Sequence, residues 1–378
     1  MVRLLHSADW QIGMTRHFLA PEAQSRYSEA RLEAIRRMAT IAADAACDAV
    51  VVCGDIFESN LVDRQVVARA LDALAEFTVP VFLLPGNHDP LLGAGSVWDA
   101  AAFASRCPPQ VTVLRDATPV RIADGSAEVI GAVWPSKRPV TDLVAAVLAD
   151  LRPADISRIV VGHGAVDRGS PDPNDPALIG LDNVERAIAD GRVHYVALGD
   201  RHSVTDVGTS GRVWYPGTPL VTDYSEDAPN TALLVELDAG SVTVTPVPVG
   251  EWTFVRSAVE LAGDDDVAAL EGWLAARPDK RRCVVKLSFT GVVSLAAKLR
   301  LDAVLDAYAD VFAGLEIWDR RTDLVVIPDD ADLAEIGATG FLAGAIEDLK
   351  LLVAAGGRDG ETAQDALSLL YRLSRDAA

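Results

Sequence analysis

Short apolar runs alternate with longer stretches of helical periodicity through the first 200 residues of the chain. Apolar runs of four to eight residues are typical of buried strands, and apolar positions three and four residues apart are typical of helices. The expected strands comprise residues 3–7, 49–53, 79–84, 111–114, 128–134, 158–161 and 193–198. The expected helices comprise residues 21–46, 65–77 and 142–151. This alternation predicts a layered α/β domain.

The pattern changes after residue 203. A strand beginning at residue 213 and an antiparallel pair over residues 231–237 and 241–249 are expected to close the first domain. A smaller α+β unit follows, with helices at 265–276 and 296–312 and strands at 283–289 and 324–327. Two amphipathic helices, 341–355 and 361–375, form the tail and are split by glycines 356, 357 and 360. Because 378 residues exceed what one core usually supports, we expect domains over 1–250 and 251–335 and a helical tail over 340–378.

Polar side chains follow five of the expected strands where each strand ends. They are Asp9, Asp55, Asn87 with His88, His163, and Asp200 with His202. In open α/β sheets, ligands bind beyond the carboxyl ends of the strands, so these side chains are expected to meet at one edge. The turn at residues 85–90 presents an amide, an imidazole and a carboxylate in succession, and Gly86 allows a ligand to approach the backbone closely.

These residue types predict a two-metal phosphoesterase centre. Two divalent ions need one bridging carboxylate and terminal ligands on each side, and together they offset the charge of a phosphate. The expected ligands are Asp55 as the bridge, Asp9, Gln11 and His202 on one metal, and Asn87, His163 and Asp200 on the other. His88 follows a ligand and keeps its imidazole free, so we expect it to protonate the leaving oxygen or stabilise developing charge.

Composition limits the partners and the compartment. A formal net charge of −21 and a pI near 4.6 argue against binding nucleic acid through the overall field, so any DNA contact must be local, through metals or shared with a partner. The four cysteines have no close spacing, which indicates neither a zinc site nor a disulfide framework. No apolar run reaches membrane-spanning length and the start does not resemble a cleavable signal, so a cytoplasmic protein without membrane contact is expected.

The order of the motifs resembles that of the calcineurin-like metallophosphoesterases. The motifs are Asp9-Trp10-Gln11, Gly54-Asp55, Gly86-Asn87-His88-Asp89, Gly162-His163 and Gly199-Asp200-Arg201-His202. Within that superfamily, the stretches 6–9, 54–57 and 215–219 resemble the SbcD-type DNA repair nucleases. The resemblance implies a four-layer αββα sandwich, a capping domain and ATPase-binding helices in the tail. It also implies DNA as substrate, an SbcC-type coiled-coil ATPase as partner and a homodimer, and it matches His88 to the catalytic histidine.

The chain departs from that family at two positions. Gln11 stands where a histidine is usual, and Asp200 replaces the first histidine of a Gly-His-x-His motif. Both changes put oxygen in place of nitrogen, which favours Mn²⁺, with Mg²⁺ as the second choice, over softer ions. Two alternatives to the nuclease therefore stay open: a phosphodiesterase for a small nucleotide, and a catalytically weakened scaffold that recruits the ATPase.

The last tail helix carries apolar side chains at helical spacing. They are Ala363, Ala366, Leu367, Leu370 and Tyr371, with Leu369 and Leu373 widening the face. A short helix is marginal alone, so this face must be buried. We expect it to dock on the partner ATPase, with packing on the chain's own capping domain as the alternative.

Overall fold

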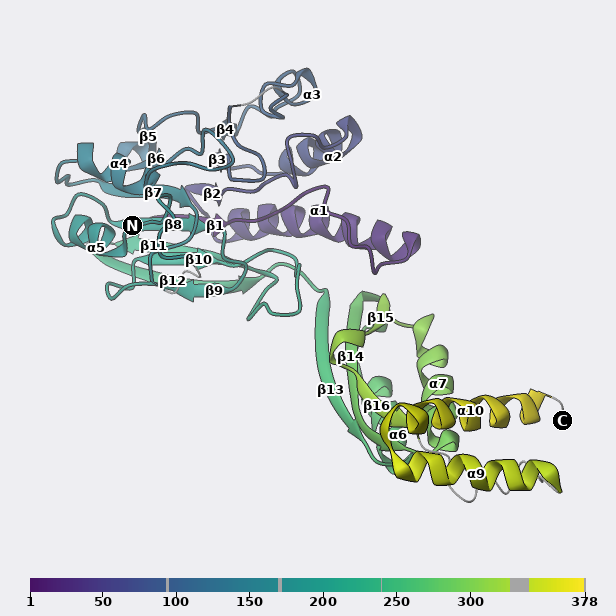
Figure 1. The fold of residues 1–378 in the computed structure, drawn as a ribbon. Coiled ribbons are helices and arrows are strands. Elements are labelled where there is room, and N and C mark those ends of the chain that lie inside the picture. The colour runs from purple at the N-terminus through teal and green to yellow at the C-terminus, as the bar shows by residue number, and fades with distance from the viewer. Residues whose placement is uncertain (93–94, 169–171, 239, 327–339, 377–378) are drawn as a thin grey trace. The chain divides into compact units, whose positions relative to one another are not determined.

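A computed structural model describes the chain except for residues 93–94, 169–171, 239, 327–339 and 377–378 (Figure 1). The chain divides into two compact units. The first unit comprises Met1–His17 and Gln24–Trp252, and the second comprises Phe18–Ala23 and Thr253–Ala378.

The first sheet of the first unit is built around four parallel strands. Its order is β12 (Ser241–Pro248), β11 (Thr231–Asp238), β1 (Val2–Ser7), β2 (Ala49–Cys53), β3 (Val81–Leu84) and β4 (Val111–Val113). Strands β1 to β4 pair in parallel, while β11 and β12 form the expected antiparallel pair at the β1 edge. Helices α1 (Pro21–Asp44) and α2 (Arg64–Leu74) and the short α3 (Ala101–Ala104) contribute to the core on its outer face.

The second sheet is also mixed. Its order is β5 (Val120–Ile122), β6 (Ala127–Gly131), β7 (Ser157–His163), β8 (Tyr195–Gly199), β10 (Val213–Pro216) and β9 (Val204–Asp206). Helices α4 (Leu143–Asp150) and α5 (Leu181–Ala189) cover its outer face, and the inner faces of both sheets share one apolar core. The four layers, helices, sheet, sheet and helices, confirm the expected α/β sandwich.

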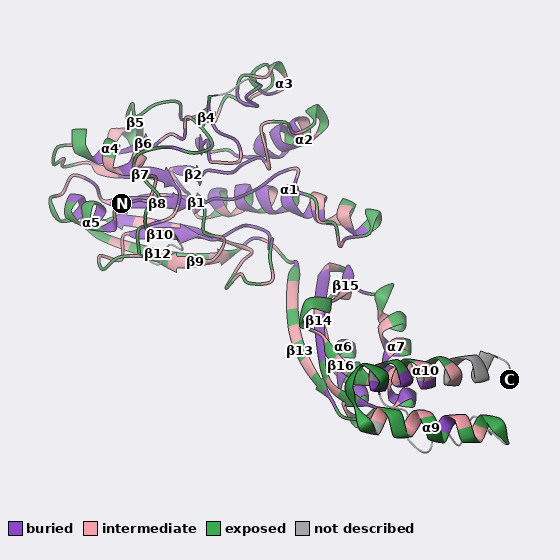
Figure 2. Cartoon of the chain, in the orientation of Figure 1, coloured by how far each residue is buried: buried purple, intermediate pink, exposed green. Residues whose placement is uncertain are grey.

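Strand β2 shows how the residue pattern produces this layering. Val50 and Val52 point into the core beneath α1 and α2, whereas Ala49, Val51 and Cys53 point into the core between the sheets. Every residue of β2 is buried, as Figure 2 shows for most strands at the centre of this unit. A strand covered on both faces reads as a continuous apolar run, which is why the sequence located it.

The second unit contains a sheet whose described strand pairs are all parallel. Strand β14 (Cys283–Val293) lies beside β13 (Thr253–Leu261), and its other edge pairs with β15 (Gly314–Ile317) and then with β16 (Asp323–Val326). Helices α6 (Asp264–Ala275) and α7 (Leu295–Ala309) share an apolar core with this sheet. Residue 327, expected to end the last strand, lies outside the described residues.

The tail forms two packed helices, α9 (Phe341–Ala355) and α10 (Gly357–Asp376). Gly360 was expected in a flexible joint but lies within α10, where an added Cβ would stand 3.1 Å from the carbonyl oxygen of Leu352. It therefore permits close approach of the two helices. Ala363 and Leu367 are buried, and Leu367 packs against Ile346 of α9 in the tail itself, whereas Leu369 is half exposed.

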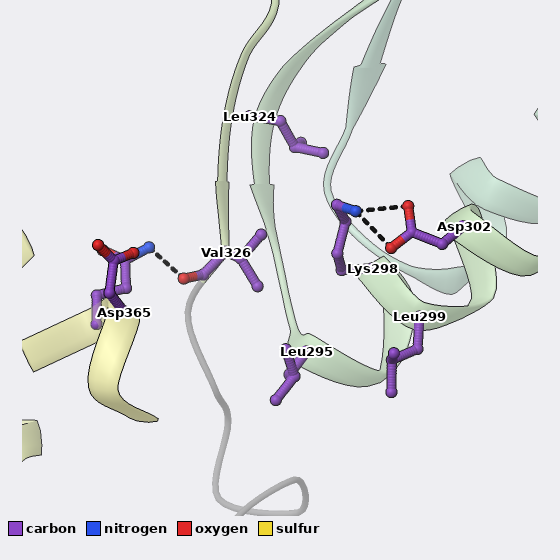
Figure 3. A pocket seen from close by; sticks show the side chains of 8 residues that line it. Leu295, Lys298, Leu299, Asp302, Leu324, Val326 and Asp365 are labelled. Carbon is purple, nitrogen blue, oxygen red and sulfur yellow. Dashed lines mark hydrogen bonds and ion pairs between the residues drawn. The ribbon is translucent and has the colours of Figure 1, made fainter. Parts of the chain in front are cut away.

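A groove of about 270 Å³ lies beside α10 in the second unit (Figure 3). Its walls come from α7, from the end of β16 and from α10, whose Gln364 side chain hydrogen-bonds the carbonyl of Val326. Lys298 and Asp302 line the groove and form an ion pair between successive turns of α7. The Gln364 contact ties the tail to the rest of the second unit.

Sequence periodicity missed several short elements. Strands β5, β9, β13 and β15 and helices α3 and α5 were not expected, and the strand expected at 128–134 ends at Gly131. Exposed and half-buried positions alternate along much of β13, so it lacks the long apolar run that marks a central strand. The remaining described elements are short 3₁₀ turns at Ala123–Gly125, Lys280–Arg282 and Asp319–Arg321.

All four cysteines are free thiols, and three of them are buried. None of the helices within the described ranges combines the length and apolar character that crossing a bilayer requires.

Candidate active site

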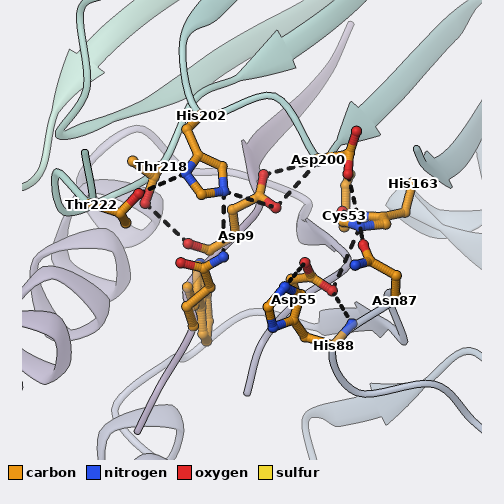
Figure 4. Close-up of polar contacts among 12 residues, drawn as sticks. Asp9, Cys53, Asp55, Asn87, His88, His163, Asp200, His202, Thr218 and Thr222 are labelled. Atoms are coloured by element: carbon orange, nitrogen blue, oxygen red, sulfur yellow. Dashed lines mark hydrogen bonds and ion pairs between the residues drawn. The ribbon is translucent and has the colours of Figure 1, made fainter. Parts of the chain in front are cut away.

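The predicted site residues gather where strands of both sheets of the first unit end (Figure 4). Asp9 follows β1, Asp55 follows β2 and Asn87 follows β3, whereas His163 ends β7 and Asp200 follows β8. Five strand ends therefore deliver polar side chains to one place.

The centre of the cluster is formed by Asp9, Asp55 and His163. One potential ligand atom from each of the three lies within 4.8 Å of the others, and all three residues are buried. The Nε2 atom of His163 is 3.5 Å from Oδ1 of Asp55. Such a group of buried ligand atoms fits a divalent cation.

Gln11 and His202 lie on the Asp9 side of this centre. Nε2 of His202 is 3.9 Å from Oδ1 of Asp9 and 3.4 Å from Nε2 of Gln11. Among the described residues, the buried Oε1 atom of Gln11 has no hydrogen-bond partner. A buried carbonyl oxygen without a partner is costly, and a cation would satisfy it.

Asn87 and Asp200 lie on the His163 side. Oδ1 of Asn87 is 2.7 Å from Nε2 of His163, and Oδ1 of Asp200 is 3.9 Å from the same nitrogen. The backbone N–H of Asp200 donates to both carboxylate oxygens of Asp9, at 3.2 and 3.0 Å. This contact joins the two sides through the main chain.

His88 lies at the rim, and about a third of its side chain is exposed. Its backbone N–H donates to Oδ1 of Asp55 at 2.9 Å, which fixes the turn against the carboxylate. Nδ1 lies 2.9 Å from the carbonyl oxygen of Glu58 and must donate to it, because a carbonyl only accepts. Nε2 is left as the atom that faces Asp55, 4.0 Å from Oδ2.

Four non-glycine site residues have left-handed backbone conformations. The φ angles are 54° for Asp9, 44° for Gln11, 54° for Asp55 and 100° for Asp200. Positive φ is uncommon for residues with a Cβ and costs about 1–2 kcal/mol per residue, somewhat less for aspartate. Strained backbone of this kind concentrates at functional sites, where the surrounding structure holds it in place.

Two glycines allow the strand ends to meet. A Cβ on Gly86 would stand 2.2 Å from Oδ1 of Asp55, and one on Gly199 would stand 1.8 Å from the carbonyl oxygen of Cys53. Any side chain at either position would push apart segments that the site requires in contact.

Burial and crowded charge shift the pKa values at the centre. Burial, and then the neighbouring carboxylates Asp55 and Asp200, raise the pKa of Asp9 to about 7 against the opposing effect of His202 and His163. Burial lowers the pKa of His163, but Asp55, Asp9 and Asp200 outweigh it and raise the value to about 9. Protonation is favoured at both residues, so the cluster is short of positive charge.

The donor set fits two divalent cations. The buried carboxylates of Asp9 and Asp55 meet the buried imidazole of His163, the carbonyl of Gln11 has no partner among the described residues, and the shifted pKa values indicate missing positive charge. Asp9, Gln11 and His202 offer ligand atoms on one side, and Asn87, His163 and Asp200 offer them on the other. Asp55 lies between the labelled residues of the two sides in Figure 4. Oxygen outnumbers nitrogen, which suits Mn²⁺ and Mg²⁺.

Sequence reasoning missed residues that hold this cluster in place. The buried carboxylate of Asp89 accepts hydrogen bonds from the N–H groups of Gly86 (2.7 Å) and Phe57 (2.9 Å) and so shapes the turn before His88. Burial, and then the charge of Asp55, raise the pKa of Asp89 to about 7. Glu226 contacts Nδ1 of His202, but residues 223, 226 and 227 are all acidic and no pattern marks one of them.

A family model described as calcineurin-like phosphoesterase matches residues 2–204. The SbcD component of the SbcCD nuclease from Bacillus subtilis (strain 168) is 34% identical over 92 residues, which is 23% of this chain and 22% of that protein. The DNA double-strand break repair protein Mre11 of Methanosarcina mazei is 22% identical over 268 residues, 68% of this chain and 40% of that protein. Mre11 of Haloferax volcanii is 25% identical over 277 residues, 71% of this chain and 56% of that protein.

The matches thus span between 22% and 56% of the length of these relatives. Among solved structures, TT1561 of Thermus thermophilus superposes with a TM-score of 0.41 at 14% identity, covering 65% of this chain and 98% of that one. A score this low carries no argument about activity. The family model covers more than half of the chain and contains all five strand-end motifs in full, and on that match the chain belongs to the calcineurin-like phosphoesterase family.

Proposed function

We propose that the chain is a two-metal phosphodiesterase, and that its substrate is DNA. The observation that carries the proposal is the buried meeting of Asp9, Asp55 and His163 beside the unpartnered carbonyl of Gln11. This arrangement is unfavourable without cations and favourable with them.

When bound, a pair of divalent cations activates water for attack and neutralises phosphate charge. The chain contributes the ligand side chains and the backbone that orients them. Because Nδ1–H of His88 is held by the carbonyl oxygen of Glu58, the ring would contribute a proton at Nε2 from its doubly protonated imidazolium form. The partial exposure of the ring leaves it accessible to a substrate.

Mn²⁺ is the cation we propose, with Mg²⁺ as the second choice. Gln11 and Asp200 replace imidazole donors of the family pattern with oxygen donors, and hard cations prefer oxygen.

The proposed substrate and partner rest on the relatives. One is named as a subunit of the SbcCD nuclease and two as DNA double-strand break repair proteins. By resemblance, we propose a DNA nuclease subunit that works with an SbcC-type coiled-coil ATPase and forms a homodimer.

We further propose that residues 1–250 form the nuclease domain, residues 251–335 a capping domain and residues 340–378 the ATPase-binding tail. Exposed apolar side chains on the outer face of α9 support docking of the tail. Phe341 is 91% exposed and Leu352 45% exposed, and eleven residues of helix bring them to the same face. Replacing both with Asp should abolish co-purification with the ATPase and leave the melting temperature unchanged.

A small-nucleotide phosphodiesterase is the second candidate, favoured by the net charge of −21. An inactive scaffold is disfavoured, because both departures from the family pattern keep an oxygen donor.

The test compares two substrates under the same metal conditions. Purified protein with Mn²⁺ is assayed on end-labelled duplex and single-stranded DNA and on bis-p-nitrophenyl phosphate, with EDTA as the control. DNA cleavage that depends on Mn²⁺ supports the nuclease. Cleavage of the small phosphodiester alone supports the second candidate, and no cleavage of either contradicts the proposal.

A further inference from the structure

His202 is held by side chains that lie outside the predicted ligand set. Its Nδ1 atom lies 2.7 Å from Oγ1 of Thr222 and 2.9 Å from Oε1 of Glu226. The Glu226 side chain is only 5% exposed, so this contact is shielded from water.

The hydrogen-bond donors around Glu226 determine which nitrogen of His202 carries the proton. The backbone N–H of Thr222 donates to Oε2 at 2.8 Å, and the Thr222 hydroxyl donates to Oε1. An ionised carboxylate only accepts, so Nδ1 of His202 must be a donor. In the neutral ring, the lone pair therefore lies on Nε2, the atom that faces Asp9 and Gln11.

The loop that carries Glu226 is itself anchored to the site. The Thr218 hydroxyl donates to the carbonyl oxygen of Asp9 at 3.0 Å, and its N–H donates to the carbonyl oxygen of His202 at 3.2 Å. The Tyr27 hydroxyl donates to the carbonyl of Val221 at 2.6 Å, immediately before Thr222. The loop, Asp9 and His202 are thereby fixed relative to one another.

We propose that Glu226, with Thr222, is a positioning residue that holds His202 in the Nδ1–H tautomer and so makes Nε2 available as a metal ligand. This inference rests on the proposed two-metal function. Partners of this kind orient metal-binding histidines in proteins, and their loss typically costs about 10–100-fold in metal affinity. Glu226 should support only the ion on the Asp9 side, because the other histidine is held by the main chain at Cys53.

The Glu226→Gln variant separates this role from simple packing. The Thr222 N–H requires a carbonyl oxygen at the Oε2 position, which places the amide NH₂ beside Nδ1 of His202. That NH₂ donates to Nδ1 and moves the ring proton to Nε2, where it blocks the ligand atom. The isosteric Gln variant should therefore be at least as damaging as Glu226→Ala, the reverse of what packing alone would give.

The experiment uses the full chain. The His202 tautomer is determined by ¹⁵N NMR on metal-free, ¹⁵N-histidine-labelled protein at a pH where the ring is neutral, and Mn²⁺ binding is measured by calorimetry. Asp227→Asn is the matched control, because residue 227 is the next residue in the chain, is exposed and undergoes the same change of charge.

We expect the Nδ1–H tautomer in the wild type and the Nε2–H tautomer in Glu226→Gln. We also expect about 10–100-fold weaker binding of one Mn²⁺ ion in both Glu226 variants, with the second ion and the control unaffected. An Nε2–H tautomer in the wild type, or unchanged Mn²⁺ affinity in folded Glu226→Gln, would overturn the proposal. The wild-type measurement decides the matter even if the variants do not fold, and neither readout depends on phosphodiesterase activity.

Discussion

The two histidines of the cluster are oriented in the same way by different parts of the chain. Nδ1 of His163 donates to the backbone carbonyl of Cys53 at 2.8 Å, and its side chain is fully buried. Nδ1 of His202 donates to the Glu226 carboxylate at 2.9 Å, and a quarter of its side chain is exposed. Both rings turn Nε2 toward the carboxylates at the centre.

The orientation of His202 therefore depends on other side chains, whereas the orientation of His163 depends on the main chain. The acceptor for His163 is a main-chain oxygen at the end of β2, so every residue type at position 53 supplies it. The acceptors for His202 are side chains, Glu226 and Thr222, which substitutions can remove. The predicted unusual ligands divide in the same way, with Gln11 on the His202 side and Asp200 on the His163 side.

The largest loss of metal binding and activity is expected from a substitution at Asp55, where the two sides of the site meet. Asp55→Ala should remove both ions and reduce phosphodiesterase activity to background, because this carboxylate lies between the two sets of ligands. Metal content after desalting and cleavage rates are the measurements, with Asp150→Ala on the surface as the control. Two ions retained without the Asp55 carboxylate would contradict the bridging role.

His88→Ala should leave metal binding on both sides of the site unchanged and should lower only the turnover rate. General acid catalysis typically contributes about 10²–10⁴-fold, so kcat should fall by that amount while both ions are retained. Single-turnover cleavage and metal analysis of the same preparation provide the test. Unchanged cleavage would remove His88 from the mechanism.

Replacing Gln11 or Asp200 with histidine should change the metal preference of one side of the site at a time. Gln11→His should alter the metal preference of the His202 side only, and Asp200→His that of the other side only. Each new imidazole is expected to shift selectivity from Mn²⁺ toward Zn²⁺ by about tenfold, or about 1.4 kcal/mol. Competition calorimetry measures the shift for each variant and for the double variant. A preference unaffected by both substitutions would mean that neither side chain is a ligand.

The smallest effect concerns pH. Folded-state pKa values are raised for Asp9, from 3.8 to about 7, and for His163, from 6.5 to about 9. A raised pKa means that the stabilisation is complete below the unfolded value and is lost as the pH rises through the folded value. The contribution of Asp9 should fade between about pH 4 and 7, and that of His163 between about pH 6.5 and 9.

The melting temperature of EDTA-treated protein should therefore fall between pH 6.5 and 9, by about 2–4 °C for each 1 kcal/mol lost. With Mn²⁺ present the fall should be smaller, because cations replace the protons as the source of positive charge. Thermal melts at matched ionic strength test both statements. A metal-free protein that becomes more stable over this range would contradict the shifts.

The sequence alone located the strands that are buried on both faces. Strand β2 and the end of β7 read as apolar runs because both faces of each sheet are covered, and the polar residues after such runs marked the edge where the candidate site lies. The α/β class and the first unit's strand-end residues followed from that pattern. Spacing along the chain was sufficient, because parallel strands bring their carboxyl ends together.

Tertiary structure alone decided the contacts between distant segments. Glu226 meets His202 from a loop with three acidic residues, and no local pattern distinguishes the one that turns inward. The left-handed backbone at Asp9 and Asp55 depends on neighbouring strand ends that hydrogen-bond across it. Gly360 looked like a joint, yet it lies where α10 approaches the Leu352 carbonyl. Local composition records how buried a position is, whereas the identity of its neighbour depends on how the whole chain packs.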